Sequence, residues 1–163
     1  MPALKKADIN DCTEIHAMQI KAFMPLLEKY GDIETNPAAE PVERIIDRMK
    51  QEYTDYCFIC LDDINIGAIR IVRLGENECR ISPMFILPEF QGCGYAQTAL
   101  TLAEEMYPNA RCWSLDTIKQ ENKLRHIYEK SGYVATGKEE KIQEGMTIIH
   151  YEKRKNPAAS AFG

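Results

Sequence analysis

The chain has 163 residues, a hydrophobic content of 45% and a formal net charge of −5. This length and apolar content predict one folded domain with a substantial core and exclude a disordered chain. Because nucleic-acid binding requires a basic surface, the acidic balance argues against nucleic acid as the main partner. No apolar run reaches the ~18 residues that a membrane span needs, and the N-terminal MPALKKADIN lacks the apolar core of a signal peptide. We therefore expect a cytoplasmic protein that binds neither nucleic acid nor membranes.

The N-terminal part of the chain predicts a strand over residues 4–7, followed by a helix that Asn10 or Asp11 can cap. Apolar side chains then recur at helical spacing. Pro25 lies just beyond this face and is expected to break the helix, so that residues 26–30 form a short second piece.

A polar segment with two prolines, residues 31–41, predicts a loop of the kind that often carries binding residues. Pro41 suits the first turn of the next helix, whose apolar face runs from Val42 to Met49. Short turns then separate three apolar runs, and turns this short require antiparallel neighbours. These strands are expected over 56–61, 66–73 and 79–87.

The six cysteines are spread over predicted strands and helices. In a chain of this length without an export signal, reduced thiols are a better interpretation than disulfides. Cys57 and Cys60 have the spacing of a zinc knuckle, but they lie in a strand-like run, where their side chains would point to opposite faces. No second pair accompanies them, so we expect no bound metal.

Residues 81–107 carry the clearest functional signal. An apolar run at 81–87 predicts a buried strand, 88–94 is a turn with two glycines, and a helical pattern begins at Tyr95. The first N–H groups of a helix have no internal partner and carry partial positive charge, and glycine lets the backbone approach a phosphate. We expect a diphosphate to bind at 91–96, although the glycines alone are equally compatible with a simple tight turn.

The C-terminal part of the chain completes the sheet. A strand–helix–strand connection is a right-handed crossover, so the strand that follows the helix should run parallel to the strand that precedes it. We expect residues 1–155 to form a single domain and residues 156–163 to form a flexible tail. The remaining elements are expected as a strand over 111–115, a helix over 121–130 and strands over 133–136 and 147–153.

This order of elements, together with the segment QGCGYA at 91–96, resembles the GNAT superfamily of acetyl-CoA-dependent N-acetyltransferases. Gln91, Gly94 and Ala96 satisfy the family's acyl-CoA motif, which is Gln or Arg, two residues, Gly, one residue, then Gly or Ala. The segment YEKSGY at 128–133 resembles the family's second signature, and the resemblance covers nearly the whole chain. It implies an α+β fold, an α/β three-layer sandwich whose mixed, mainly antiparallel central sheet is splayed between strands four and five and flanked by about four helices.

The resemblance also implies an activity, which is direct transfer of an acetyl group from acetyl-CoA to a primary amine of a small molecule or peptide. In many relatives an Asn seven residues before the signature Tyr contacts the cofactor; here Glu121 holds that position, and the adjacent Asn122 becomes the candidate. Homodimers are common in the family, so a homodimer is compatible with the resemblance. The predicted cofactor contacts are Phe85, Ile86, Leu87, Gln91, Gly92, Cys93, Gly94, Tyr95, Ala96, Asn122 and Tyr128.

For catalysis, the resemblance implies Tyr128 as the general acid for the leaving thiolate and the N–H of Ile86 as the oxyanion donor. A lysine-like amine has a pKa near ~10.4, so a group must accept its proton before attack. Glu34, Glu78 and Asp116 are candidate bases; Asp116 lies at the end of a strand, where α/β sites gather, and a water chain is equally compatible. The candidate substrate contacts are Tyr30 and Glu34.

Two other classes of protein share parts of this pattern. A NAD-type dinucleotide-binding oxidoreductase would use Gly92 and Gly94 as the start of its glycine fingerprint, with Asp116 at the ribose. However, Gln97 occupies its third glycine position, and the preceding strands predict an antiparallel meander. A non-catalytic acyl-CoA sensor or interaction module would keep the turn but would not require Tyr128.

Overall fold

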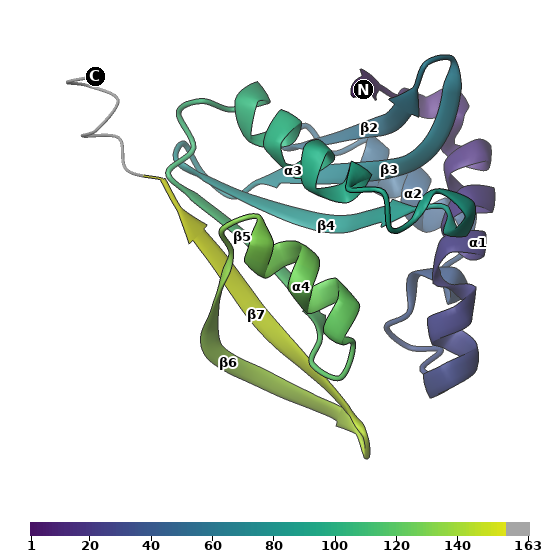
Figure 1. The fold of residues 1–163 in the computed structure, drawn as a ribbon. Helices are drawn as coiled ribbons and strands as arrows, with labels where there is room; N and C mark the ends of the chain where they lie inside the picture. Colours follow the sequence, from purple (N-terminus) through teal and green to yellow (C-terminus); the bar gives the residue numbers. More distant parts are fainter. Residues whose placement is uncertain (156–163) are drawn as a thin grey trace.

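The computed structural model describes residues 1–155, and the predicted tail lies outside the described residues. Seven strands form one mixed sheet in the order β1-β2-β3-β4-β5-β7-β6. Helices α1 and α2 cover one face of the sheet, whereas α3 and α4 cover the other (Figure 1). This arrangement confirms the predicted mixed sheet between helical layers.

The elements follow the predicted order closely. The strands are β1 (Pro2–Lys6), β2 (Thr54–Leu61), β3 (Ile64–Arg73), β4 (Glu78–Ile86), β5 (Cys112–Ile118), β6 (Val134–Gln143) and β7 (Met146–Arg154). The α-helices are α1 (Cys12–Tyr30), α2 (Val42–Met49), α3 (Tyr95–Met106) and α4 (Asn122–Lys130), and short 3-10 turns occupy η1 (Ile9–Asp11), η2 (Pro37–Ala39) and η3 (Pro88–Phe90). Within residues 1–155, no helix combines the length and apolar character needed to cross a membrane.

The central strands are buried on both faces because helices cover both sides. Along β2, Cys57 belongs to the core under α3 and α4, whereas Cys60 belongs to the core under α1 and α2. The prediction that these two cysteines point to opposite faces is therefore confirmed. Gly67 on β3 permits the close approach of β4, since an added Cβ would lie 2.2 Å from the carbonyl oxygen of Phe85.

Strands β4 and β5 pair in parallel over a short distance only. Their pairing joins Glu78–Arg80 to Cys112–Ser114 and stops there, after which the two strands diverge. Figure 1 shows β4 and β5 separating beside α4. The predicted splay between the fourth and fifth strands is thus confirmed, and it leaves one edge of β4 without a strand neighbour beyond Arg80.

The first helix differs from the prediction in two respects. It runs without a break through Pro25, because a proline removes one helical hydrogen bond and the turns on either side retain theirs. It ends at Gly31, where the left-handed backbone (φ 66°) lets the N–H donate to the Leu27 carbonyl at 2.7 Å. The predicted side-chain cap from Asn10 or Asp11 is wrong: Asp11 holds the N-cap position of α1 without a side-chain hydrogen bond, and the capping box joins Asp8 and Asp11 at the preceding turn η1.

The sixth strand is longer than predicted. The sequence pattern places a strand at 133–136, but β6 continues to Gln143 and is exposed along almost all of its length. Its outer part is charged and lacks alternating apolar residues, so periodicity gave no signal there. Pairing with β7 forms the strand instead, which shows tertiary context overriding local pattern.

Candidate functional site

The turn between β4 and α3 presents a row of free backbone donors. Gly92 and Gly94 adopt left-handed conformations with φ values of 80° and 82°. No backbone carbonyl within residues 1–155 accepts from the N–H groups of residues 92–96, since α3 begins at Tyr95 and its first bond is donated by Thr98. Such free donors at the positive end of a helix favour an anion. The position agrees with the predicted diphosphate site.

A cavity of about 610 Å³ opens directly beside this turn, between β4, α3 and α4. It is lined by Gln91, Gly92, Gly94, Tyr95 and Ala96 from the turn, and by Asn122 and Tyr128 from α4. Two basic side chains, Lys123 and His126, also line it. The sequence reasoning missed these two residues, although their place one helical turn apart on α4 could have shown that they share a face.

The free edge of β4 faces the same space. The N–H of Leu87 donates to the Ile66 carbonyl on β3 at 2.8 Å. Because antiparallel strands alternate the direction of their N–H groups, the N–H groups of Met84 and Ile86 point away from β3, toward the splay. The Ile86 carbonyl accepts a hydrogen bond from the Gln91 side chain at 2.8 Å, which fixes the end of β4 to the turn.

Tyr128 on α4 lines this cavity and is buried. Its ring packs edge-on against Tyr133, with centroids 6.5 Å apart, and lies tilted beside Tyr151. Burial raises the pKa of the Tyr128 phenol to about 12, because the charged form loses hydration. The phenol therefore stays protonated, and able to donate a proton, throughout the neutral range.

A second cavity of about 420 Å³ lies on the other side of β4 and is bounded by α1 and by the β5 and β7 strands. Its lining is mainly apolar, with Phe23, Leu26 and Ile148 among the contributors. Both cavities share a boundary, because the same residues line each of them. These shared residues are Met84, Phe85, Ile86, Gln91, Lys123, Leu124 and Tyr128.

Two carboxylates line the second cavity, and both are already paired. The Asp116 carboxylate accepts from Arg80 and from His150, each at 2.8 Å. Burial disfavours the charged form of Asp116, but these two hydrogen bonds outweigh burial and hold its pKa below the ordinary value. Such a carboxylate is a weak proton acceptor, which counts against Asp116 as the base.

Glu121 is the other carboxylate of this cavity. It accepts from the Lys29 ammonium at 2.7 Å and from the Tyr30 hydroxyl at 2.5 Å. Burial raises its pKa, but the hydrogen bonds from Lys29 and Tyr30 outweigh that effect, and the net pKa lies below the ordinary value. Tyr30, a predicted substrate contact, lines neither cavity, and its hydroxyl instead joins the end of α1 to the start of α4.

Several predicted site residues lie outside both cavities. Leu87 and Cys93 line neither cavity, although each is adjacent to residues that do. Glu34 and Glu78 are exposed, and they also line neither cavity. The cavity-lining residues among the predictions are Phe85, Ile86, Gln91, Gly92, Gly94, Tyr95, Ala96, Asn122, Asp116 and Tyr128.

With this geometry described, comparison with known proteins identifies the family. The model of the acetyltransferase (GNAT) domain family matches residues 28–155. The chain therefore belongs to the GNAT acetyltransferases, as its turn and its second signature predict. No protein in the curated set matches the chain at the significance required.

Solved structures show the same fold at low sequence identity. A spermidine N-acetyltransferase from Vibrio cholerae, in complex with CoA and spermine, has a TM-score of 0.73 and 18% identity, covering 94% of this chain and 95% of that chain. The PaiA N-acetyltransferase from Thermoplasma acidophilum, in complex with coenzyme A, has a TM-score of 0.71 and 15% identity, covering 95% of this chain and 99% of that chain. An acetyltransferase from Thermus thermophilus has a TM-score of 0.71 and 14% identity, covering 95% of this chain and 97% of that chain.

Proposed function

We propose that this acetyltransferase moves the acetyl group of acetyl-CoA to a primary amine of a small molecule or peptide. One observation carries the proposal: two cavities meet at the free edge of β4, and they share Met84, Ile86 and Tyr128. A donor molecule in the first cavity and an acceptor in the second would face each other across this shared boundary. The GNAT family membership supports the same reaction class.

The residues of the first cavity fit coenzyme A. Its diphosphate needs several donors close together, and the free N–H groups of residues 92–96 supply them at the start of α3. Added Cβ atoms at Gly92 and Gly94 would meet no protein atom closer than 3.9 Å, so the space above the glycines is open to a ligand. The amide-rich pantetheine arm suits the unpaired edge of β4, and the Lys123 ammonium supplies positive charge in the same cavity.

When bound, acetyl-CoA would supply an activated thioester. The N–H of Ile86, which points into the splay, is our candidate donor to the carbonyl oxygen as negative charge develops there. Tyr128 is our candidate proton donor to the departing sulfur, because its raised pKa keeps the phenol protonated. We assign Asn122 to the cofactor side, since it lines the first cavity and not the second.

The acceptor amine must be neutral to attack, and we propose that its proton leaves through water. Asp116 and Glu121 are each held by cations and have lowered pKa values. Because both carboxylates are already neutralised, the cavity offers little to a second or third ammonium group. We therefore favour an acceptor with one amine on an apolar body over a polyamine.

The proposal is tested by following thiol release from acetyl-CoA with a panel of amines, including arylalkylamines, amino acids, peptides and aminoglycosides. Spermidine and spermine belong in the panel, because the Vibrio cholerae neighbour is described as a spermidine N-acetyltransferase. Turnover with a monoamine would support the proposal. Tight binding of CoA without turnover on any amine would indicate a non-catalytic sensor instead, and binding of NAD in place of CoA would contradict the proposed cofactor.

A further inference from the structure

The edge of β4 that faces both cavities begins with a bulge. Ile69 on β3 pairs with Met84, whereas Ile71 pairs with Ile81, so Arg70 alone lies opposite both Ser82 and Pro83. An extra residue of this kind interrupts the ladder and redirects the strand that carries it. The redirected residues are those whose backbone borders the two cavities.

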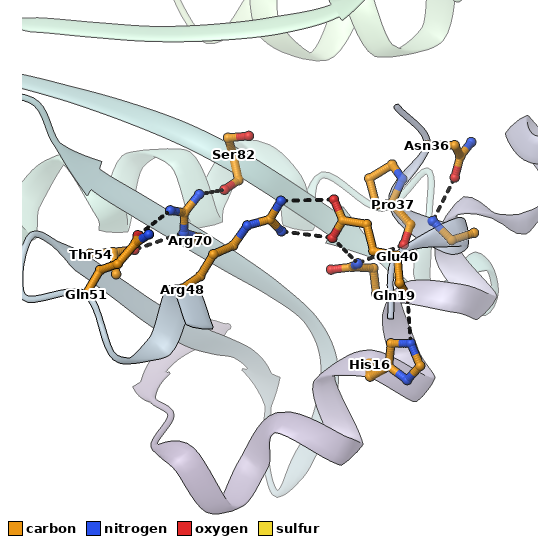
Figure 2. A network of polar contacts seen from close by, with 11 residues as sticks. His16, Gln19, Asn36, Pro37, Glu40, Arg48, Gln51, Thr54, Arg70 and Ser82 are labelled. Carbon is orange, nitrogen blue, oxygen red and sulfur yellow. Dashed lines mark hydrogen bonds and ion pairs between the residues drawn. The ribbon is translucent and has the colours of Figure 1, made fainter. Parts of the chain in front are cut away.

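A buried arginine side chain holds this bulge. Arg70 as a residue is 9% exposed, and its guanidinium donates to the Ser82 carbonyl at 2.9 Å, to the Thr54 hydroxyl at 3.0 Å and to the Gln51 side chain at 3.0 Å. Figure 2 shows the guanidinium between these three neutral oxygens. Across residues 1–155, no carboxylate forms an ion pair with it.

Burying a charge without a counter-charge lowers the stability of the folded protein, and an apolar side chain of similar size is usually less destabilising at such a position. Burial accordingly lowers the pKa of the Arg70 guanidinium. The neighbouring Arg48 differs, because it forms a bidentate ion pair with Glu40, with nitrogen–oxygen distances of 2.9 and 3.0 Å (Figure 2). Because the buried charge of Arg70 has no carboxylate partner, we look for a role of this residue other than stabilising the fold.

We propose that Arg70 is a positioning residue for acetyl transfer: by donating to the Ser82 carbonyl it fixes the bulge and thereby the direction of Met84 and Ile86. The inference rests on the proposed function, in which the Ile86 N–H contacts the reacting carbonyl. Arg70 itself lines neither cavity, whereas Ser82, which it holds, lines the second cavity and lies four residues before Ile86 on the same strand.

Arg70→Met keeps most of the side-chain length but removes all three donated hydrogen bonds. Arg70→Lys keeps the charge, but one ammonium on a flexible stem cannot reproduce the planar fork. Small displacements of positioned groups cost about 100-fold in rate, so we expect kcat to fall roughly 10- to 100-fold in both variants. The affinity for CoA should change less than about threefold, because the glycine turn that holds the diphosphate is not touched.

The matched control is Arg73→Met on the same strand. The Arg73 side chain donates to Asp55 at 2.6 Å and to the Glu52 carbonyl, and neither contact involves β4. We expect this variant to keep kcat within about twofold of the unmodified protein, because the bulge is unchanged. If all three variants lost thermal stability, that loss would not explain a fall in kcat at nearly unchanged CoA affinity in the two Arg70 variants.

The second readout is amide hydrogen exchange of Phe85 in the absence of ligand, because its N–H faces β3 across the ladder just beyond the bulge. We expect faster exchange in Arg70→Met and Arg70→Lys, and no change in Arg73→Met. Unchanged exchange in the Arg70 variants would overturn the inference, as would a kcat equal to that of Arg73→Met. Absence of turnover in the unmodified protein would contradict the proposed function instead, while the exchange experiment would still decide whether Arg70 holds the bulge.

Discussion

Substitution of Gly94 by Ala tests the diphosphate site in a quantitative way. Gly94 has a φ of 82°, and an added Cβ would meet nothing closer than the Gln97 side chain at 3.9 Å. The substitution should therefore lower the free energy of unfolding by about 1–2 kcal/mol, mainly because a residue with a Cβ is strained in the left-handed region. For a chain of this size, each kcal/mol corresponds to a fall in Tm of about 2–4 °C.

Binding of CoA should suffer separately and more severely. The new methyl group would occupy the open space beside the free N–H groups of residues 92–96. Loss of one hydrogen bond to a charged group costs about 1.5–3 kcal/mol. The Kd for CoA should therefore rise roughly 10- to 100-fold.

Gly145→Ala provides the matched control, because Gly145 also has a φ of 82° with nothing within 4 Å, but lies in the turn between β6 and β7. Both variants should lose similar stability in thermal melts, whereas only Gly94→Ala should weaken CoA in isothermal titration. Equal CoA affinities in the two variants, at equal loss of Tm, would refute the assignment of the diphosphate to this turn.

Three further predictions concern single side chains. Tyr128→Phe should lower kcat about 100-fold with little change in CoA affinity. In the unmodified enzyme, the rate should rise with pH as the acceptor amine deprotonates. Because burial raises the pKa of Tyr128 to about 12, the rate should not fall again up to about pH 10. Cys93→Ala should retain kcat/KM within about twofold, because the exposed thiol lines neither cavity, whereas abolished turnover would indicate a covalent cysteine mechanism. Gly67→Ala should destabilise the protein by about 1–3 kcal/mol in urea unfolding, because its Cβ would meet the Phe85 carbonyl oxygen at 2.2 Å; an unchanged midpoint would show that β3 can shift without cost.

The sequence predicted the elements whose signals are local. Gly92 and Gly94 stand between an apolar run and a helical pattern, so the turn, the helix start and the free N–H groups follow from neighbouring residues. The parallel pairing of β4 and β5 also followed, because handedness restricts a strand–helix–strand connection. Local rules failed at Pro25 and along β6, where helix continuity and pairing with β7 outweighed the pattern.

The ionisation of the candidate base could not be read from the sequence. Asp116 on β5 is paired with Arg80 on β4 and His150 on β7, and these residues are far apart in the chain. Their convergence depends on strand order and register, which periodicity does not give. The same applies to Arg70, whose three acceptors come from β2, from β4 and from the segment after α2.

A crystal structure of the protein with coenzyme A would test the central claim most directly. The account predicts diphosphate oxygens within hydrogen-bond distance of the N–H groups of residues 92–96, with the thiol beside Ile86 and Tyr128. Coenzyme A bound elsewhere, or with its diphosphate away from the glycine turn, would contradict both the cofactor site and the catalytic roles proposed from it.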